Sequence, residues 1–187
     1  YVQAVGELKV KLRGIRKQYR KQQRHSPIEF VTGRVKSIES IQEKMVMHGI
    51  SLENLDRDMN DIAGLRIMVQ FEDDITEVLK VLRQRKDMKI VLERDYITYK
   101  KPSGYRSYHV IVEYPVDTID GNKVVLAEIQ IRTLAMNFWA TIEHSLNYKY
   151  KGEFPQEIKE RLEITARIAY ELDKTMGEIR HDIQEAQ

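Results

Sequence analysis

The chain has 187 residues, a formal net charge of +2 at pH 7 and no cysteine. This length fits one domain. The lack of cysteine excludes disulfides and thiolate chemistry, and the small net charge argues against a dedicated nucleic-acid binder. No apolar run approaches the roughly 20 residues of a membrane span, so we expect no membrane segment. Charge is nonetheless uneven, because residues 9–24 carry eight bases and no acid, whereas residues 156–187 carry eight acids against five bases.

Hydrophobic periodicity predicts two helices at the start of the chain. A basic helix is expected over about 2–22, and its apolar residues recur at steps of three and four: Val5, Leu8, Leu12, Ile15 and Tyr19. Ser26 and Pro27 end this pattern. A second helix follows over about 35–47 and stops near Gly49.

The middle of the chain has the composition of strands, with one helix among them. We predict strands over 63–71, 89–92, 106–114 and 123–132, and helices over 73–85, 134–150 and about 155–187. Asp120-Gly121 indicates a hairpin turn, because this pair tolerates the positive φ that such turns need. The order predicts a single domain of the α+β class, with a mixed, largely antiparallel sheet flanked by helices.

The final predicted helix carries a heptad stripe of mostly apolar residues. Its members alternate four and three residues apart: Ile158, Leu162, Thr165, Ala169, Leu172, Met176, Ile179 and Ile183. Two interpretations remain open at this point. The stripe either packs within the chain, against the first helix, or forms an interface between copies.

Alternation along two predicted strands collects polar side chains on one face of the sheet. They are Glu128, Gln130 and Arg132 on the strand over 123–132, and Tyr105, Ser107 and His109 beside the strand before it. An aromatic ring can stack on a base, an imidazole can contact a phosphate, and a carboxylate can hold a metal or accept a proton. A solvated outer face has the same pattern, so that alternative stays open.

Asp61 is a second candidate carboxylate, because it directly precedes the strand over 63–71 and stands close to Arg66. Mg²⁺ takes few protein ligands and completes its shell with phosphate and water, so two acids on adjacent elements can hold it. Capping the start of an element is the alternative role for Asp61. Cations that suit a triphosphate lie around the start of the second predicted helix: Arg34, Lys36 and Lys44.

Four runs of the chain, taken in order, resemble the RelA/SpoT-type alarmone synthetases, and within them the small RelQ-type enzymes. They are HSPIEFVTGRVK (25–36), DIAGLRI (61–67), SGYRSYH (103–109) and EIQIRTLAMNFWATIEHSLNYKY (128–150). The resemblance covers essentially the whole chain. It implies a nucleotidyltransferase-like synthetase fold in a cytoplasmic enzyme. Such an enzyme moves the β,γ-pyrophosphate of ATP onto the 3′-hydroxyl of GDP or GTP with the help of Mg²⁺.

The resemblance also implies a role for each matching position. Asp61 and Glu128 match the magnesium-binding carboxylates, and Glu128 matches the acceptor of the 3′-hydroxyl proton. The ATP set has two arginines around the adenine and two lysines near the phosphates: Arg34, Arg66, Lys36 and Lys44. The acceptor set has a tyrosine that stacks on guanine and four polar residues that line the site: Tyr105, Arg94, Lys101, His109 and Gln130.

RelQ-type relatives form tetramers and bind their alarmone product at an allosteric site. The resemblance therefore implies a homotetramer regulated by its product. The matching positions are Lys9, Arg13 and Arg16 for the phosphates, and Glu29, Phe30, Thr32 and Asn137 near the base. The chain shows neither the hydrolase domain nor the regulatory extension of the long relatives, so we expect neither alarmone breakdown nor ribosome-coupled control.

Three other functions remain as alternatives. The basic first helix and ten tyrosines permit a groove for single-stranded RNA. A nucleotidyltransferase that releases pyrophosphate is a second alternative, although the usual Gly-Ser followed by two acids one residue apart is missing from the sequence. A catalytically inactive interaction domain is the third. The presence of both Asp61 and Glu128 argues against it.

Overall fold

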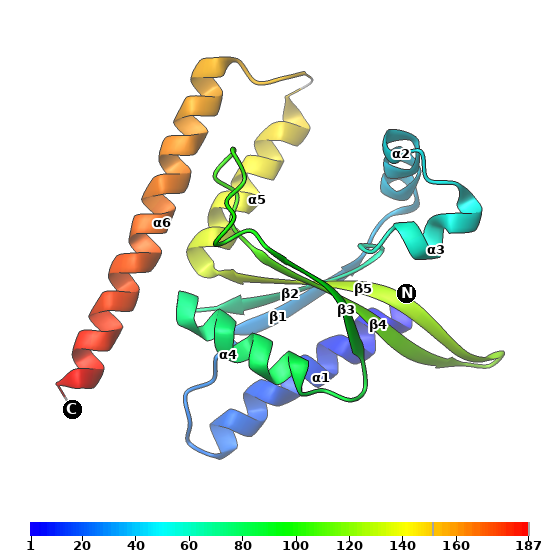
Figure 1. Ribbon diagram of the computed structural model, residues 1–187, viewed down its shortest axis with the longest axis horizontal. Helices are drawn as coiled ribbons and strands as arrows, with labels where there is room; N and C mark the ends of the chain where they lie inside the picture. Colours follow the sequence, from blue (N-terminus) through cyan, green and yellow to red (C-terminus); the bar gives the residue numbers. More distant parts are fainter. Residues whose placement is uncertain (151, 187) are drawn as a thin grey trace.

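One five-stranded sheet organises the computed structural model, which describes residues 1–150 and 152–186 (Figure 1). The strands are β1 (Phe30–Val35), β2 (Ala63–Val69), β3 (Lys89–Asp95), β4 (Tyr108–Thr118) and β5 (Gly121–Thr133). They lie in the order β1-β2-β5-β4-β3, and only the β2–β5 pair is parallel. This arrangement confirms the predicted α+β class with a mixed, largely antiparallel sheet.

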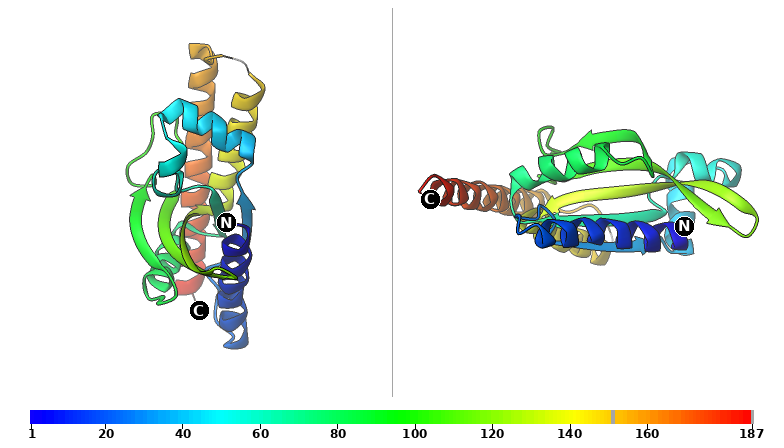
Figure 2. Two further views of the ribbon diagram at one scale, coloured as in Figure 1. Left: turned by 90° about the vertical axis from the view of Figure 1, so that its right-hand side faces the viewer. Right: turned by 90° about the horizontal axis from the view of Figure 1, so that it is seen from below.

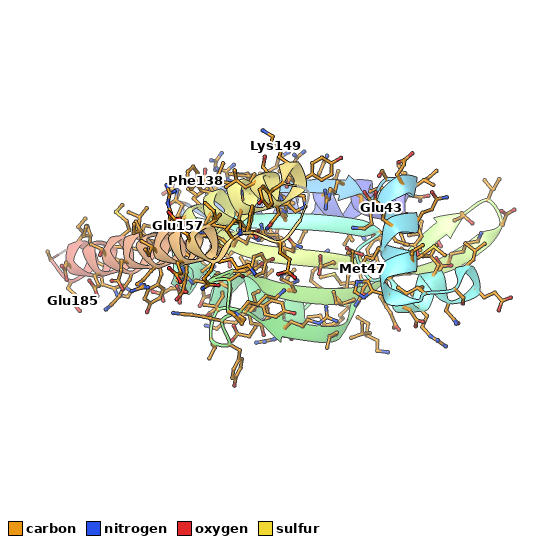
Figure 3. All side chains as sticks on the ribbon, turned by 90° about the horizontal axis from the view of Figure 1, so that it is seen from above. Glu43, Met47, Phe138, Lys149, Glu157 and Glu185 are labelled. Atoms are coloured by element: carbon orange, nitrogen blue, oxygen red, sulfur yellow. The ribbon has the colours of Figure 1, made fainter. Side chains whose placement is uncertain are left out.

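Helices lie on both sides of this sheet. They are α1 (Val2–Lys21), α2 (Ile38–His48), the short 3₁₀ helix η1 (Leu52–Asn54), α3 (Leu55–Asp58), α4 (Glu72–Arg83), α5 (Leu134–Lys149) and α6 (Gln156–Glu185). Figures 1 and 2 show α1 and α4 together on one side. On the other side α2 and α3 stand at one end and α5 and α6 at the other, so the middle of that face is left open (Figure 3).

The core lies between the sheet and the helices α1 and α4. Helix α1 buries one stripe, which is Ala4, Val5, Leu8, Leu12 and Ile15, and α4 buries Ile75, Val78, Leu79 and Leu82. Alternate residues of the central strands meet these stripes, including Leu65, Ile67, Ile129 and Ile131. Each fully buried aliphatic side chain contributes about 1.5–3 kcal/mol. The face of the sheet that α1 and α4 cover therefore supplies most of the stability, and the polar residues lie on the opposite face.

Local sequence explains where several elements begin and end. Helix α2 starts later than expected, because the Ser37 side chain accepts a hydrogen bond from the backbone of Ser40 and caps it. The hairpin between β4 and β5 turns at Ile119 and Asp120, and Gly121 opens β5 with a φ of 104°. The predicted Asp-Gly turn is thus one residue out of place. The pieces η1 and α3 were not expected, since residues 52–58 show no periodic pattern.

Helix α6 packs chiefly on α5 and α4, so the predicted packing against the first helix is wrong. The expected end of this helix at residue 187 lies outside the described residues. Large apolar side chains on its outer side remain about half exposed: Ile168, Leu172, Met176, Ile179 and Ile183. The stripe thus packs within the chain where Leu162 and Ala169 meet Trp139 and Ala140 of α5, and an interface between copies stays a prediction for its exposed part. Within the described part of the chain, no helix has the length and apolar character to cross a membrane.

Candidate active site

The open face of the sheet carries one polar residue from each strand in a single row. Register places Thr32 opposite Arg66, Arg66 opposite Gln130, Gln130 opposite His109, and His109 opposite Arg94. Directly paired residues project to the same side of a sheet, so the five side chains form one continuous polar strip. Sequence alternation had predicted the shared side of Gln130 and His109, and the sheet order adds the others.

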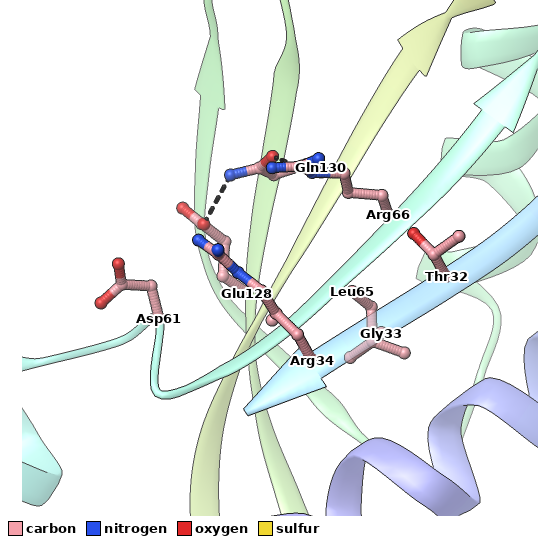
Figure 4. Close-up of a pocket in the computed structure, with 9 residues that line it drawn as sticks. Thr32, Gly33, Arg34, Asp61, Leu65, Arg66, Glu128 and Gln130 are labelled. Atoms are coloured by element: carbon pink, nitrogen blue, oxygen red, sulfur yellow. Dashed lines mark hydrogen bonds between the residues drawn. The ribbon is translucent and has the colours of Figure 1, made fainter. Parts of the chain in front are cut away.

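A cavity of about 190 Å³ opens beside this row, at the ends of β1 and β2 (Figure 4). Its lining consists of Thr32, Gly33, Arg34, Asp61, Gly64, Leu65, Arg66, Glu128 and Gln130. Gly64 pairs with Arg34 on one side and Glu128 on the other. Because Gly64 has no side chain, the space between the guanidinium and the carboxylate stays open. The cavity therefore joins both candidate carboxylates and both predicted adenine-binding arginines.

Asp61 is held by two lysines that the sequence had assigned to phosphate binding. Its Oδ2 lies 3.0 Å from Lys36 Nζ, and its Oδ1 lies 2.9 Å from Lys44 Nζ. Burial alone would raise the pKa of Asp61, but the hydrogen bonds from Lys44 and Lys36 outweigh it and lower the pKa below its ordinary value. Asp61 is therefore an ionised carboxylate. It forms ion pairs with both lysines, which capping the start of an element would not require.

Glu128 stands in the centre of the open face, with its side chain only 12% exposed. Its Oε1 lies 2.9 Å from His109 Nδ1, and its Oε2 accepts a hydrogen bond of 2.8 Å from Gln130 Nε2. Burial opposes ionisation, yet the hydrogen bonds from His109 and Gln130 keep the pKa of Glu128 below its ordinary value. The carboxylate is thus ready to accept a proton or to bind a cation.

Tyr105 joins the same network from the loop before β4. Its hydroxyl lies 2.8 Å from His109 Nε2 and accepts a hydrogen bond of 2.6 Å from Arg132 Nη2. Because Arg132 donates to this oxygen, the hydroxyl proton can point to Nε2, which leaves Nδ1–H of His109 to donate to Glu128. Gln130 Oε1 accepts from both Arg66 and Arg132. One hydrogen-bonded chain therefore links Tyr105 to Glu128 and to the cavity.

Aromatic and cationic groups surround the Tyr105 ring. Lys101 Nζ lies 5.1 Å from the centroid of that ring and 4.6 Å from the centroid of Tyr96. The rings of Tyr96 and Tyr105 meet edge to face at 6.1 Å. The structure thus brings Lys101 to the predicted acceptor site. It also adds Tyr96, which sequence reasoning had not assigned, and Arg132, which alternation placed on this face without a role. Tyr96 follows Arg94 by two residues, a spacing that could have indicated it.

The residues predicted to bind a regulatory nucleotide gather mainly along the edge strand β1. Arg13 Nη2 donates to the Val31 carbonyl at 3.1 Å, and Arg16 Nη2 lies 3.1 Å from Glu29 Oε1. Lys9 shares helix α1 with them, and Phe30 is 42% exposed. Thr32 instead lines the central cavity, and Asn137 comes from α5. The structure therefore places most of this set on α1 and β1, whereas Asn137 comes from another helix.

The two carboxylates form a suitable donor set for a divalent cation that prefers oxygen ligands. Both line one cavity, both have lowered pKa values, and Asp61 is close enough to influence the charge of Glu128. Among the described residues no group of three or more acids or histidines forms a complete cage. Mg²⁺ usually takes one or two carboxylates and completes its shell with phosphates and water. Asp61 and Glu128 therefore fit Mg²⁺ that shares its ligands with a nucleotide.

Comparisons with known proteins find relatives that match along the whole chain. The chain is 59% identical over 187 residues to GTP pyrophosphokinase YjbM of Bacillus subtilis, covering all of this chain and 88% of the relative. A GTP pyrophosphokinase family protein from Streptococcus pneumoniae is 74% identical, with a TM-score of 0.95 over 100% of this chain and 92% of the other.

The small alarmone synthetase 1 of Bacillus subtilis bound to its product pppGpp is also similar. It is 59% identical, with a TM-score of 0.95 over 98% of this chain and 94% of the other. Its complex with AMPCPP is 54% identical by the same comparison, with a TM-score of 0.87 over 99% and 94%. Residues 33–153 match the family model described as the region found in RelA/SpoT proteins. The chain therefore belongs to the RelA/SpoT family.

Proposed function

We propose that the chain transfers the β,γ-pyrophosphate of ATP to the 3′-hydroxyl of GDP or GTP, giving AMP and ppGpp or pppGpp. The observation that carries this proposal is the position of Glu128. It lies between a cavity lined by Arg34, Arg66 and Asp61 and a network that ends on Tyr105. A carboxylate between two distinct binding regions suits a transfer between two substrates.

The cavity suits the ATP donor. Arg34 and Arg66 approach it from β1 and β2, and planar guanidinium groups can stack on both faces of an adenine. Lys36 and Lys44 lie next to Asp61 at its other end, where they can bind the triphosphate. Support from a relative comes from the Bacillus subtilis synthetase that binds AMPCPP.

The region around Tyr105 suits the guanosine acceptor. The tyrosine ring offers a stacking surface for guanine, and Lys101, Arg94 and His109 supply cations and donors for the acceptor phosphates and ribose. His109 also holds Glu128 in place through its Nδ1. An acceptor stacked on Tyr105 would then direct its ribose toward the carboxylate.

The proposed reaction needs one proton transfer and one displacement at phosphorus. Glu128 accepts the proton of the 3′-hydroxyl while the 3′-oxygen of the acceptor bonds to the β-phosphorus of ATP. The bond from that phosphorus to the α,β-bridging oxygen breaks and releases AMP. Lys36 and Lys44 hold the donor phosphates in line and offset their charge, since positioning and charge stabilisation supply most of the catalysis in phosphoryl-type transfer. When bound by Asp61 and Glu128, Mg²⁺ would lower the charge of the transferring phosphates.

Product analysis tests this function directly. Purified protein is incubated with ATP, Mg²⁺ and either GDP or GTP, and the nucleotides are separated by anion exchange. One AMP for each guanosine nucleotide that gains two phosphates is the expected result, and the two rates rank the acceptors. Release of ADP or free pyrophosphate would instead contradict pyrophosphate transfer and favour an ATPase or another nucleotidyltransferase.

We further propose that the enzyme is a homotetramer activated by its alarmone product through the basic helix α1. Half-exposed apolar side chains on α5 and α6, such as Ile142 and Leu172, support contact between copies. Arg13 and Arg16 reach the edge of β1, which continues into the ATP cavity through Thr32 and Arg34. A ligand bound along this edge would therefore contact the strand that supports the donor site.

Adding pppGpp is expected to raise the initial rate about fivefold or more, the lower range of ordinary allosteric coupling. A Lys9/Arg13/Arg16 triple alanine variant should lose this response because it loses the phosphate-binding charges. The matched control replaces Lys17, Arg20 and Lys21 with alanine, a change that removes the same charge from the same helix. Light scattering reports the assembly. Equal rates with and without pppGpp, or a monomer of 22.1 kDa, would contradict the corresponding part of the proposal.

A further inference from the structure

A buried ionic contact lies directly beneath the Tyr105 loop, outside the catalytic residues described above. Arg106 is 4% exposed and Asp173 of α6 is 7% exposed. Arg106 Nη1 donates to Asp173 Oδ2 at 3.2 Å, and its Nη2 contacts Glu72 in the first turn of α4. Burial raises the pKa of Asp173 despite the hydrogen bonds it receives. Burying two charges carries a desolvation penalty that often exceeds their attraction, so this contact is an inefficient way to gain stability.

Asp173 also contacts the end of β5, the strand that carries Glu128. Thr133 Oγ1 donates to Asp173 Oδ2 at 2.8 Å, and Thr133 is both the last residue of β5 and the N-cap of α5. Arg106 lies next to Tyr105 and just before β4. The Asp173 carboxylate therefore connects the segment just before β4 with the end of β5.

The loop that carries Tyr105 contacts α6 at several of its residues. The Tyr170 ring lies between two cations of this region, with Lys100 Nζ 4.0 Å and Arg106 Cζ 4.8 Å from its centroid. Gly104 has a φ of +84°, and a Cβ built there would lie 2.4 Å from the Cβ of Ala166. Only glycine permits so close an approach to the helix, so the position of the loop depends on the position of α6.

Tyr105 itself packs on the second, smaller core cluster of the protein. That cluster consists of Trp139 and Ala140 of α5 and Ala166 of α6. Trp139 Nε1 donates to Thr165 Oγ1 at 3.0 Å, which ties the indole to α6 as well. The side chain that we assign to guanine stacking is thus supported from below by α5 and α6.

We propose that Arg106 and Asp173 are positioning residues through which α6 sets the place of Tyr105 and thereby the affinity for the guanosine acceptor. The inference rests on the proposed function. The described residues that line the ATP cavity include none from α6. Disturbing this contact should therefore weaken acceptor binding and leave donor binding unchanged, a separation that a general loss of stability would not produce.

The experiment compares Asp173→Asn, Tyr170→Leu and Tyr170→Phe with the wild-type enzyme. Asp173→Asn and Tyr170→Leu are expected to raise KM for GDP about tenfold and to change KM for ATP less than about twofold, since tenfold corresponds to one ordinary interaction. Tyr170→Phe keeps the ring between Lys100 and Arg106 and should retain the wild-type KM for GDP. Binding of GDP alone, measured by calorimetry and by the emission of Trp139, the single tryptophan, gives a readout that does not depend on turnover.

Arg180→Met is the matched control on the same helix. Arg180 joins α6 to α4 through Asp74 at 3.1 Å and lies 4.5 Å above the Phe71 ring, away from the Tyr105 loop. It should lower the melting temperature without changing either KM. If Asp173→Asn does not fold, comparison of Tyr170→Leu with Tyr170→Phe tests the inference instead, because Tyr170 is partly exposed.

Two outcomes would overturn the inference: an unchanged GDP affinity in Asp173→Asn and Tyr170→Leu, or equal rises of both KM values in these variants and in Arg180→Met. A wild-type protein that binds GDP but forms no AMP would overturn the proposed function instead. In that case the calorimetric comparison of GDP binding would still test the role of α6. The supporting result is a rise in the dissociation constant of GDP that only the ring-preserving variant avoids.

Discussion

Replacing Glu128 with glutamine lowers kcat by about a thousandfold or more, because the variant loses its proton acceptor and a cation ligand together. A positioned general base alone contributes about 10²–10⁴-fold. The amide has the size of the carboxylate and can still accept a hydrogen bond from His109 Nδ1, which lies 2.9 Å from Glu128 Oε1. The fold should therefore persist, and the melting temperature should change little. Steady-state kinetics with ATP and GDP measure the effect, and Glu128→Ala should be at least as inactive.

Glu113→Gln is the matched control for this substitution. Glu113 lies on β4 of the same sheet and pairs with Lys89, outside the cavity, so its variant should keep wild-type kinetics. The lowered pKa of Glu128 adds a second expectation. A depressed pKa keeps the carboxylate ionised until the pH falls below the ordinary value of 4.5. Protonation of Glu128 should therefore not lower the wild-type kcat at any pH above that value. Near-normal kcat in Glu128→Gln would contradict the assigned role.

Sequence alone could predict the polar face of β5, because alternation along a strand depends only on neighbouring residues. It placed Glu128 and Gln130 together and separated them from Ile129 and Ile131. It could not show that β2 lies beside β5, since these strands are more than 50 residues apart in the chain. The contact between Arg66 and Gln130 follows from that pairing alone.

The heptad stripe of α6 shows a different limit of sequence reasoning. Periodicity identified a helix correctly, but beyond Leu162 the buried side of this helix carries small and polar residues: Ala166, Ala169 and Asp173. The large residues of the predicted stripe, such as Leu172 and Ile179, face outward. Small residues allow close packing of α5 and the Tyr105 loop, and hydrophobic size does not reveal such a surface. The two alanines spaced by three were the available indication.

The ion pairs of Asp61 illustrate how a site residue can be recognised while its state is missed. Sequence reasoning assigned Asp61 to a metal and Lys36 and Lys44 to phosphate, as separate groups. The structure places both lysines within 3.0 Å of the carboxylate. Without a nucleotide, the lysines neutralise Asp61 themselves. An incoming triphosphate would attract both lysines and release Asp61 for a cation, so the donor and its metal should bind together.

This arrangement predicts that metal binding depends on the nucleotide, and Asp61→Asn should therefore have the second largest effect. We expect kcat/KM for ATP to fall about a hundredfold or more, because the loss of charge removes a ligand and leaves two partly buried cations unpaired. Mn²⁺, followed by electron paramagnetic resonance, should bind wild-type protein weakly alone and tightly with AMPCPP. Asp61→Asn should lose the tight state. Asp58→Asn, a change in a nearby exposed acid that pairs with Arg57, is the matched control.

A Lys36→Met/Lys44→Met variant separates the two roles of the lysines. With Asp61 no longer neutralised, Mn²⁺ should bind the nucleotide-free protein about tenfold more tightly than it binds wild type, a gain of about 1.4 kcal/mol. Binding of AMPCPP should weaken in the same variant, since the phosphates lose two cations. Tight Mn²⁺ binding to wild-type protein without nucleotide would show that the lysines do not block the carboxylate. A double variant with unchanged Mn²⁺ affinity would show that Asp61 is not the residue that they restrain.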